Sequence, residues 1–120
     1  MQKITIVMYH YVRDLPNTQY PAIKGLLTPH FENQLSYLMK HYHIVGLSEC
    51  ISVLKEDSEL PPNACLLTFD DGYIDHYQTV FPILKRNKVR GCFFPPAKAI
   101  LNQEVLDVNK IHFILAAASE

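Results

Sequence analysis

Residues 64–72 have the sequence ACLLTFDDG, an apolar run that ends in two acids and a glycine. A run this continuous in its hydrophobicity is typical of a strand buried on both faces of a sheet. Asp70 and Asp71 follow at its C-terminal end, and Gly72 lets the backbone turn there. Ligands bind at this end of the sheet in parallel α/β folds. The stretch therefore predicts a buried strand with a candidate site at its end.

Strand patterns and helix patterns alternate along the chain. Short apolar runs, rich in β-branched or aromatic residues, predict strands over residues 3–8 (a buried one), 43–46, 64–69 and 89–94. Apolar residues at helical spacing predict helices over residues 29–42, 48–54, about 82–88 and much of 97–120. Four strands alternating with four helices predict one α/β domain with a mainly parallel sheet and right-handed crossovers.

Five single positions carry more specific expectations. Thr28 and Ser48 are predicted N-caps of the first two helices, because short polar side chains satisfy free amides there. Tyr73 and Tyr77 lie at helical spacing, which favours the core over stacking on a sugar. Within the same segment, we expect His76 to face solvent.

Composition narrows the class of protein. The chain has 120 residues, 48% of them hydrophobic, and a net charge of −1, as expected for a globular domain. No basic stripe predicts nucleic-acid binding, and no run approaches the ~20 apolar residues of a membrane span. No signal-peptide pattern is present, so we expect a cytoplasmic protein. The three widely spaced cysteines predict free thiols: Cys50, Cys65 and Cys92.

The acidic pair suggests a specific chemistry. One carboxylate binds a hard cation, while the other stays ionised near that charge and accepts a proton. Asp70 and Asp71 with Gly72 also suit a simple turn, since all three residues favour turns. His10 follows the first predicted strand and either lines the same pocket or is a packing or surface histidine.

Four segments together resemble one family. These are LLTFDDGY at 66–73, FPILK at 81–85, GCFF at 91–94 and MYHYV at 8–12. Over about residues 1–96 they resemble the NodB-homology polysaccharide deacetylases.

This resemblance implies a deformed (β/α) barrel that hydrolyses N-acetyl groups of a sugar or polysaccharide, with acetate released and an amine left. By position, Asp70 corresponds to the family's catalytic base and Asp71 to its metal-binding aspartate. The implied cofactor is a divalent metal, usually zinc, which polarises the acetamide carbonyl and activates a water. We place His10, Gly72 and Tyr73 in the substrate pocket beside the pair.

The histidines depart from the family pattern. The remaining metal ligands of the family come from a downstream His-x-x-x-His pair, and none of the six histidines here is followed by another four positions later. A barrel of βα units also needs about 250 residues. We therefore expect residues 1–120 to be the N-terminal part of the domain, a partial barrel of about four strands that is inactive alone. Its exposed sheet edge favours self-association.

Two alternatives remain open. The chain is either the first part of a sugar deacetylase or a non-catalytic module that keeps the same fold. A magnesium-dependent phosphoacceptor or phosphatase domain also uses an acidic pair. That class places its acids after the first strand, whereas Asp70 and Asp71 follow a later one, which counts against it.

Overall fold

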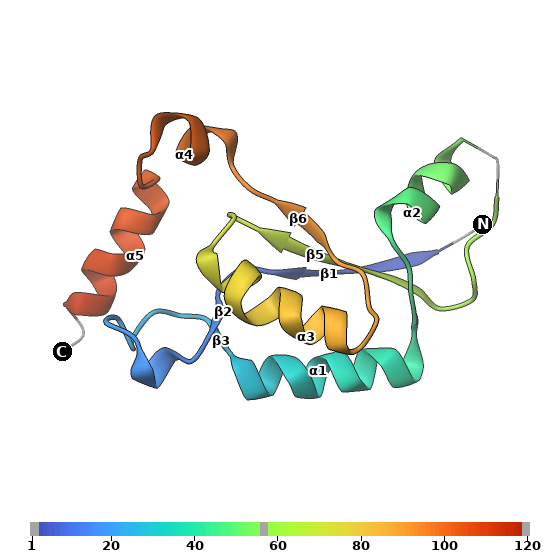
Figure 1. Ribbon diagram of the computed structural model, residues 1–120, viewed down its shortest axis with the longest axis horizontal. Coiled ribbons are helices and arrows are strands. Elements are labelled where there is room, and N and C mark those ends of the chain that lie inside the picture. The colour runs from blue at the N-terminus through green and yellow to red at the C-terminus, as the bar shows by residue number, and fades with distance from the viewer. Residues whose placement is uncertain (1–2, 56–57, 119–120) are drawn as a thin grey trace.

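A computed structural model describes residues 3–55 and 58–118. Its main sheet is parallel and is built around β5 (Ala64–Asp70), which lies between β1 (Ile4–Tyr9) and β4 (His43–Ile44) (Figure 1). The predicted α/β class, with a parallel sheet and flanking helices, is confirmed. Within the described ranges the strands do not close into a barrel.

Helices α1 (Thr28–His41) and α3 (Phe81–Arg86) lie side by side against this sheet (Figure 1). The other elements are β2 (Val12–Arg13), the 3-10 turn η1 (Leu15–Asn17), β3 (Leu26–Leu27), α2 (Leu47–Leu54), the π-helical turn η2 (His76–Val80), β6 (Cys92–Phe94), α4 (Ala97–Asn102) and α5 (Asp107–Ala117). β6 pairs in parallel with the C-terminal end of β5. The four predicted strands and the helices between them are therefore present, with the short pair β2 and β3 in addition.

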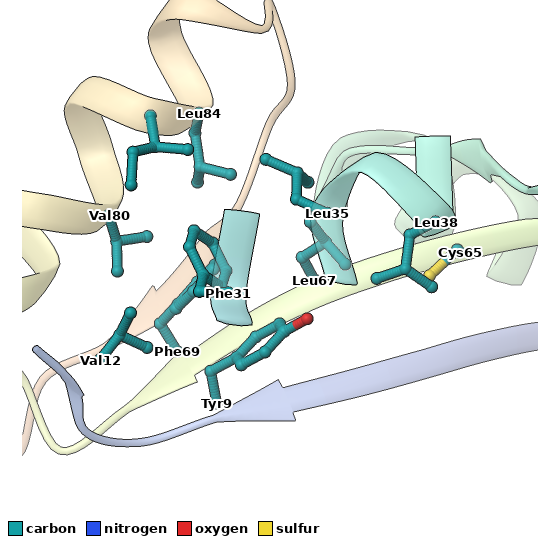
Figure 2. Packing of buried hydrophobic residues seen from close by; sticks show 11 residues of the cluster. Tyr9, Val12, Phe31, Leu35, Leu38, Cys65, Leu67, Phe69, Val80 and Leu84 are labelled. Carbon is teal, nitrogen blue, oxygen red and sulfur yellow. The ribbon is translucent and has the colours of Figure 1, made fainter. Parts of the chain in front are cut away.

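The core lies between β5 and the two covering helices, as Figure 2 shows. β5 is buried over its whole length except at Asp70, as its apolar sequence predicts. The cluster comprises Tyr9, Val12, Phe31, Leu35, Leu38, Cys65, Leu67, Phe69, Val80, Ile83 and Leu84. Burial raises the pKa of Tyr9 to about 12, and its hydroxyl has no hydrogen-bond partner among the described residues. This packing holds the end of β5 in a defined place.

β1 is less buried than its sequence predicts. Ile6 and Met8 are each 59% exposed, because nothing in the described residues covers that face of β1. Helix starts also differ by one residue from the prediction. Leu27 precedes α1 at the N-cap position, and Gly46 precedes α2, where its amide donates to Oε2 of Glu49 over 2.7 Å. The predicted caps Thr28 and Ser48 thus lie inside the first turns.

The helical segment predicted to begin at about residue 82 begins earlier in the structure. The π-helical turn η2 runs directly into α3, and Pro82 falls in the first turn of α3, where a missing amide is tolerated. A π turn holds an extra residue, so it rotates the helical face. His76 is consequently only 4% exposed and Tyr77 is 73% exposed, which makes both predictions for these side chains wrong.

The C-terminal segment is helical, as predicted. α5 packs through Ala116 and Phe113 on a second cluster that contains Tyr11, Leu15 and Ile23. The three cysteines are free thiols, as expected. Over residues 3–55 and 58–118, no helix is long and apolar enough to cross a bilayer.

Candidate active site

The acidic pair lies where the central strand ends. Asp70 is the last residue of β5 and pairs with Phe94 of β6. Asp71 and Gly72 then adopt left-handed backbone conformations, with φ of +77° and +62°. Asp71 is therefore outside the strand, and its direction is set by this turn and not by the alternation of an extended chain.

His10 lies next to Asp71. Its Nδ1 is 2.7 Å from Oδ2 of Asp71, although the two residues are 61 positions apart in sequence. The contact follows from the register of the sheet. β1 and β5 run in parallel with Tyr9 opposite Phe69, so the segments that follow the two strands leave the sheet at the same edge. The structure thus brings together His10 and Asp71, two of the predicted site residues.

A buried ion pair holds the loop that carries His10. Arg13 donates from Nε and Nη2 to the two oxygens of Asp75, over 2.8 and 2.6 Å, and the amide of Val12 donates to the same carboxylate. Asp75 is almost wholly buried. In addition, Nε2 of His76 donates to the carbonyl oxygen of His10 over 2.8 Å. Sequence reasoning missed these residues, because nothing local in the sequence connects them.

Two stacked tyrosines lie beside the acidic turn. The rings of Tyr11 and Tyr73 are 4.0 Å apart and nearly parallel, and the Arg13 guanidinium lies over the Tyr11 ring. Asn109 of α5 donates from Nδ2 to both hydroxyls, over 3.1 and 2.8 Å. Burial, followed by the hydrogen bond with Tyr11, raises the pKa of Tyr73 well above its ordinary value. Helix α5 is thereby connected to the loops around the site.

An apolar pocket of about 240 Å³ opens beside Gly72. Its walls come from the acidic turn, the π-helical turn, the start of α3 and the end of β6. The lining residues are Gly72, Tyr73, His76, Tyr77, Phe81, Phe93 and Pro95. Two residues predicted for the substrate pocket, Gly72 and Tyr73, therefore line a cavity, while neither aspartate does.

The described residues do not by themselves form a metal centre. They contain no group of three or more histidine, cysteine, aspartate or glutamate side chains close enough to hold an ion. Zinc sites in enzymes use three protein ligands. Asp71 with His10 offers fewer, so the described part of the chain does not fit a metal ion without further ligands.

Replacing Gly72 with alanine is expected to destabilise the acidic turn. The new Cβ would lie 2.8 Å from Cβ of Pro95 and 3.0 Å from its Cα, and the positive φ is unfavourable for alanine. We expect a loss of about 2 kcal/mol or more in the free energy of unfolding, measured by urea titration. Gly46→Ala is the control: its φ is −89°, its Cβ would meet mainly flexible side chains, and we expect a loss of about 1 kcal/mol or less. Equal losses would contradict the conformation of the turn.

Comparison with known proteins supplies a family context. The sequence model described as polysaccharide deacetylase matches residues 57–112. A putative polysaccharide deacetylase of Bacillus subtilis (strain 168), YxkH, is 29% identical over 99 residues, which make up 82% of this chain and 33% of that protein. The chain thus spans about a third of the length of this curated relative.

Two solved structures share the fold. The de-N-acetylase of Aggregatibacter actinomycetemcomitans matches with a TM-score of 0.66 and 28% identity, over 77% of this chain and 37% of that one. IcaB of Ammonifex degensii matches with a TM-score of 0.64 and 32% identity, over 82% of this chain and 41% of that one. Both matches therefore cover most of the present chain but less than half of the relative.

Proposed function

Because the chain belongs to the polysaccharide deacetylase family, we propose that it supplies Asp70 and Asp71 to a hydrolytic site that removes N-acetyl groups from a sugar polymer. Asp70 is the general base, and Asp71 is a ligand of a divalent metal ion. Zinc is the first candidate for this ion. The other ligands come from outside the described residues. Gly72 and Tyr73 line the substrate pocket, and His10 borders the site through its contact with Asp71.

The observation that carries this proposal is the position of the two acids. They sit at the carboxyl end of the central parallel strand, the edge at which α/β enzymes bind their ligands. Among the described residues, the side chain of Asp70 has no hydrogen bond or ion pair. A carboxylate in this state is available to accept a proton from an attacking water.

The roles of the two carboxylates follow from their different surroundings. Asp71 is turned toward His10 by its left-handed backbone, so one of its oxygens already has a partner. Asp70 remains in the strand and makes no such contact. A metal ion bound at such a site supplies polarisation of the acetamide carbonyl. A general base and an oriented metal ligand are two of the groups that metal-assisted hydrolysis of an amide uses.

The test is acetate release from N-acetylated oligosaccharides with zinc added. Two proteins are compared: the 120-residue chain, and a chimera in which this chain replaces the matching segment of the Aggregatibacter actinomycetemcomitans de-N-acetylase. We expect background release from the chain alone and turnover from the chimera. Asp70→Asn in the chimera should lower the rate about 10²–10⁴-fold, the usual contribution of a general base.

The control is Asp14→Asn, which removes an exposed carboxylate and should leave the chimera's rate unchanged. An Asp70→Asn chimera as active as its parent would exclude Asp70 as the base. Turnover by the chain alone, abolished by Asp70→Asn, would support the site but contradict the need for further ligands.

A non-catalytic module is the second candidate. The lack of a three-ligand cluster in the described ranges favours it. On this hypothesis, neither the chain nor the chimera releases acetate, while the chimera still folds. Among the described residues, β1 has an unpaired edge and an exposed face that carries Ile6 and Met8. On this hypothesis they would serve self-association, which sedimentation of the chain over a range of concentrations measures.

A further inference from the structure

The contact between His10 and Asp71 has a defined direction. A carboxylate oxygen only accepts hydrogen bonds, so the hydrogen between the two atoms belongs to Nδ1 of His10. The separation of 2.7 Å is typical of a charge-assisted hydrogen bond. This bond engages Oδ2 of Asp71 and leaves Oδ1 for another partner.

We propose that His10 is a positioning residue for Asp71: its Nδ1–H group holds Oδ2 and thereby fixes the carboxylate so that Oδ1 points to a ligand. The orientation of Asp71 stands on the geometry alone. That the ligand is a divalent cation rests on the proposed function. Hydrogen bonds of this kind orient carboxylates that bind metal ions, and their loss weakens binding about 10–100-fold.

The backbone of His10 is itself restrained by hydrogen bonds from other segments. Nε2 of His76 donates to its carbonyl oxygen, and His76 is 4% exposed in the π-helical turn. Two and three residues after His10, the amide of Val12 and the guanidinium of Arg13 donate to the Asp75 carboxylate. The loop after β1 is thus attached at several points to the segment that begins with Asp71. These contacts therefore restrain the distance between His10 and Asp71.

The backbone of Asp71 makes such a restraint necessary. A non-glycine residue with φ of +77° is strained, by about 1–3 kcal/mol, and persists only where its surroundings hold it. The carboxylate lies outside the pairing of β5, so the sheet does not orient it. Among the described residues, His10 is the hydrogen-bond partner of this side chain. Without it, the carboxylate should exchange between rotamers.

Three substitutions of His10 distinguish the loss of its hydrogen-bond donor from the loss of its ring. In His10→Asn, the amide nitrogen takes the place of Nδ1. In His10→Gln, the amide lies where Nε2 was and no donor remains near Asp71. His10→Ala removes the ring. The His10 side chain is 49% exposed, so we expect all three variants to fold, each with a loss of about 1 kcal/mol or less in the free energy of unfolding.

The first measurement is the χ1 rotamer of Asp71, from three-bond couplings to its Cγ in the full chain. We expect one rotamer in the parent and in His10→Asn, and averaged couplings in His10→Gln and His10→Ala. His43→Gln is the control, since His43 bonds to the carbonyl of Pro62 and lies at the other end of the sheet. Identical couplings in the parent and His10→Gln, or averaging in His10→Asn, would overturn the proposal.

The second measurement uses the chimera described above, because the described residues lack the further ligands that a metal ion needs. Binding of Mn²⁺ to the chimera is followed by paramagnetic broadening of the Asp71 and Gly72 amide signals. We expect His10→Gln and His10→Ala to need about 10–100-fold more Mn²⁺ for the same broadening, and His10→Asn to resemble the parent. If the couplings behave as expected but Mn²⁺ never broadens these signals in the chimera with His10 in place, the metal-ligand role of Asp71 fails and the positioning role of His10 stands. If Mn²⁺ binds the parent and His10→Gln equally well, the positioning role fails.

Discussion

Arg13→Ala is expected to lower the free energy of unfolding by about 3–5 kcal/mol, the usual cost of removing one partner from a buried ion pair. Arg13 holds both oxygens of Asp75, and the side chains of the two residues are only 20% and 3% exposed. Without the guanidinium, the Asp75 carboxylate stays buried with the amide of Val12 as its remaining donor. Urea titration of the variant and the parent measures the loss.

The matched control is Arg86→Ala. Arg86 also bonds a carboxylate over 2.6 Å, that of Glu32, but the two side chains are 65% and 43% exposed. Water and salt screen such a pair, so its removal should cost about 1 kcal/mol or less. A second variant, Arg13→Ala with Asp75→Asn, removes the unpaired charge and should recover part of the loss. Equal effects of Arg13→Ala and Arg86→Ala would show that the Arg13–Asp75 pair is not buried in solution.

Phe69→Ala is expected to cost about 3–5 kcal/mol, because a large ring leaves a cavity that its neighbours fill only in part. Phe69 is fully buried in β5, immediately before the acidic pair. Its ring stacks on Tyr9 at 5.2 Å and on Phe93 at 4.9 Å, and contacts Phe31 edge-on at 6.0 Å (Figure 2 shows the rings of Tyr9, Phe31 and Phe69). Thermal and urea unfolding of the variant measure the loss.

Phe94→Ala is the control for this prediction. Phe94 lies opposite Asp70 on the neighbouring strand, but half of its surface is exposed. Its removal should cost about 1 kcal/mol or less, since the site opens to solvent instead of forming a closed cavity. A Phe69→Ala protein as stable as Phe94→Ala would contradict the packing of the core. The result bears on function too, because this ring supports the strand end that carries Asp70.

Patterns local in the sequence predicted the elements well. The apolar run before Asp70 predicted β5 and its burial, and the helical spacing of Phe31, Leu35 and Leu38 predicted α1. Predictions failed where one residue changes the helical phase. The π-helical turn rotated His76 inward and Tyr77 outward, and no composition signal distinguishes such a turn from an α-helical one.

The sequence by itself determined the α/β class, the position of the acidic pair after a buried strand, and the resemblance to the deacetylase family, because these depend on neighbours in the chain. Only the tertiary structure decided the contacts around that pair. His10 meets Asp71, and Arg13 meets Asp75, across more than 60 residues. These contacts depend on the parallel pairing of β1 with β5, which brings together residues far apart in the chain and is decided by tertiary packing.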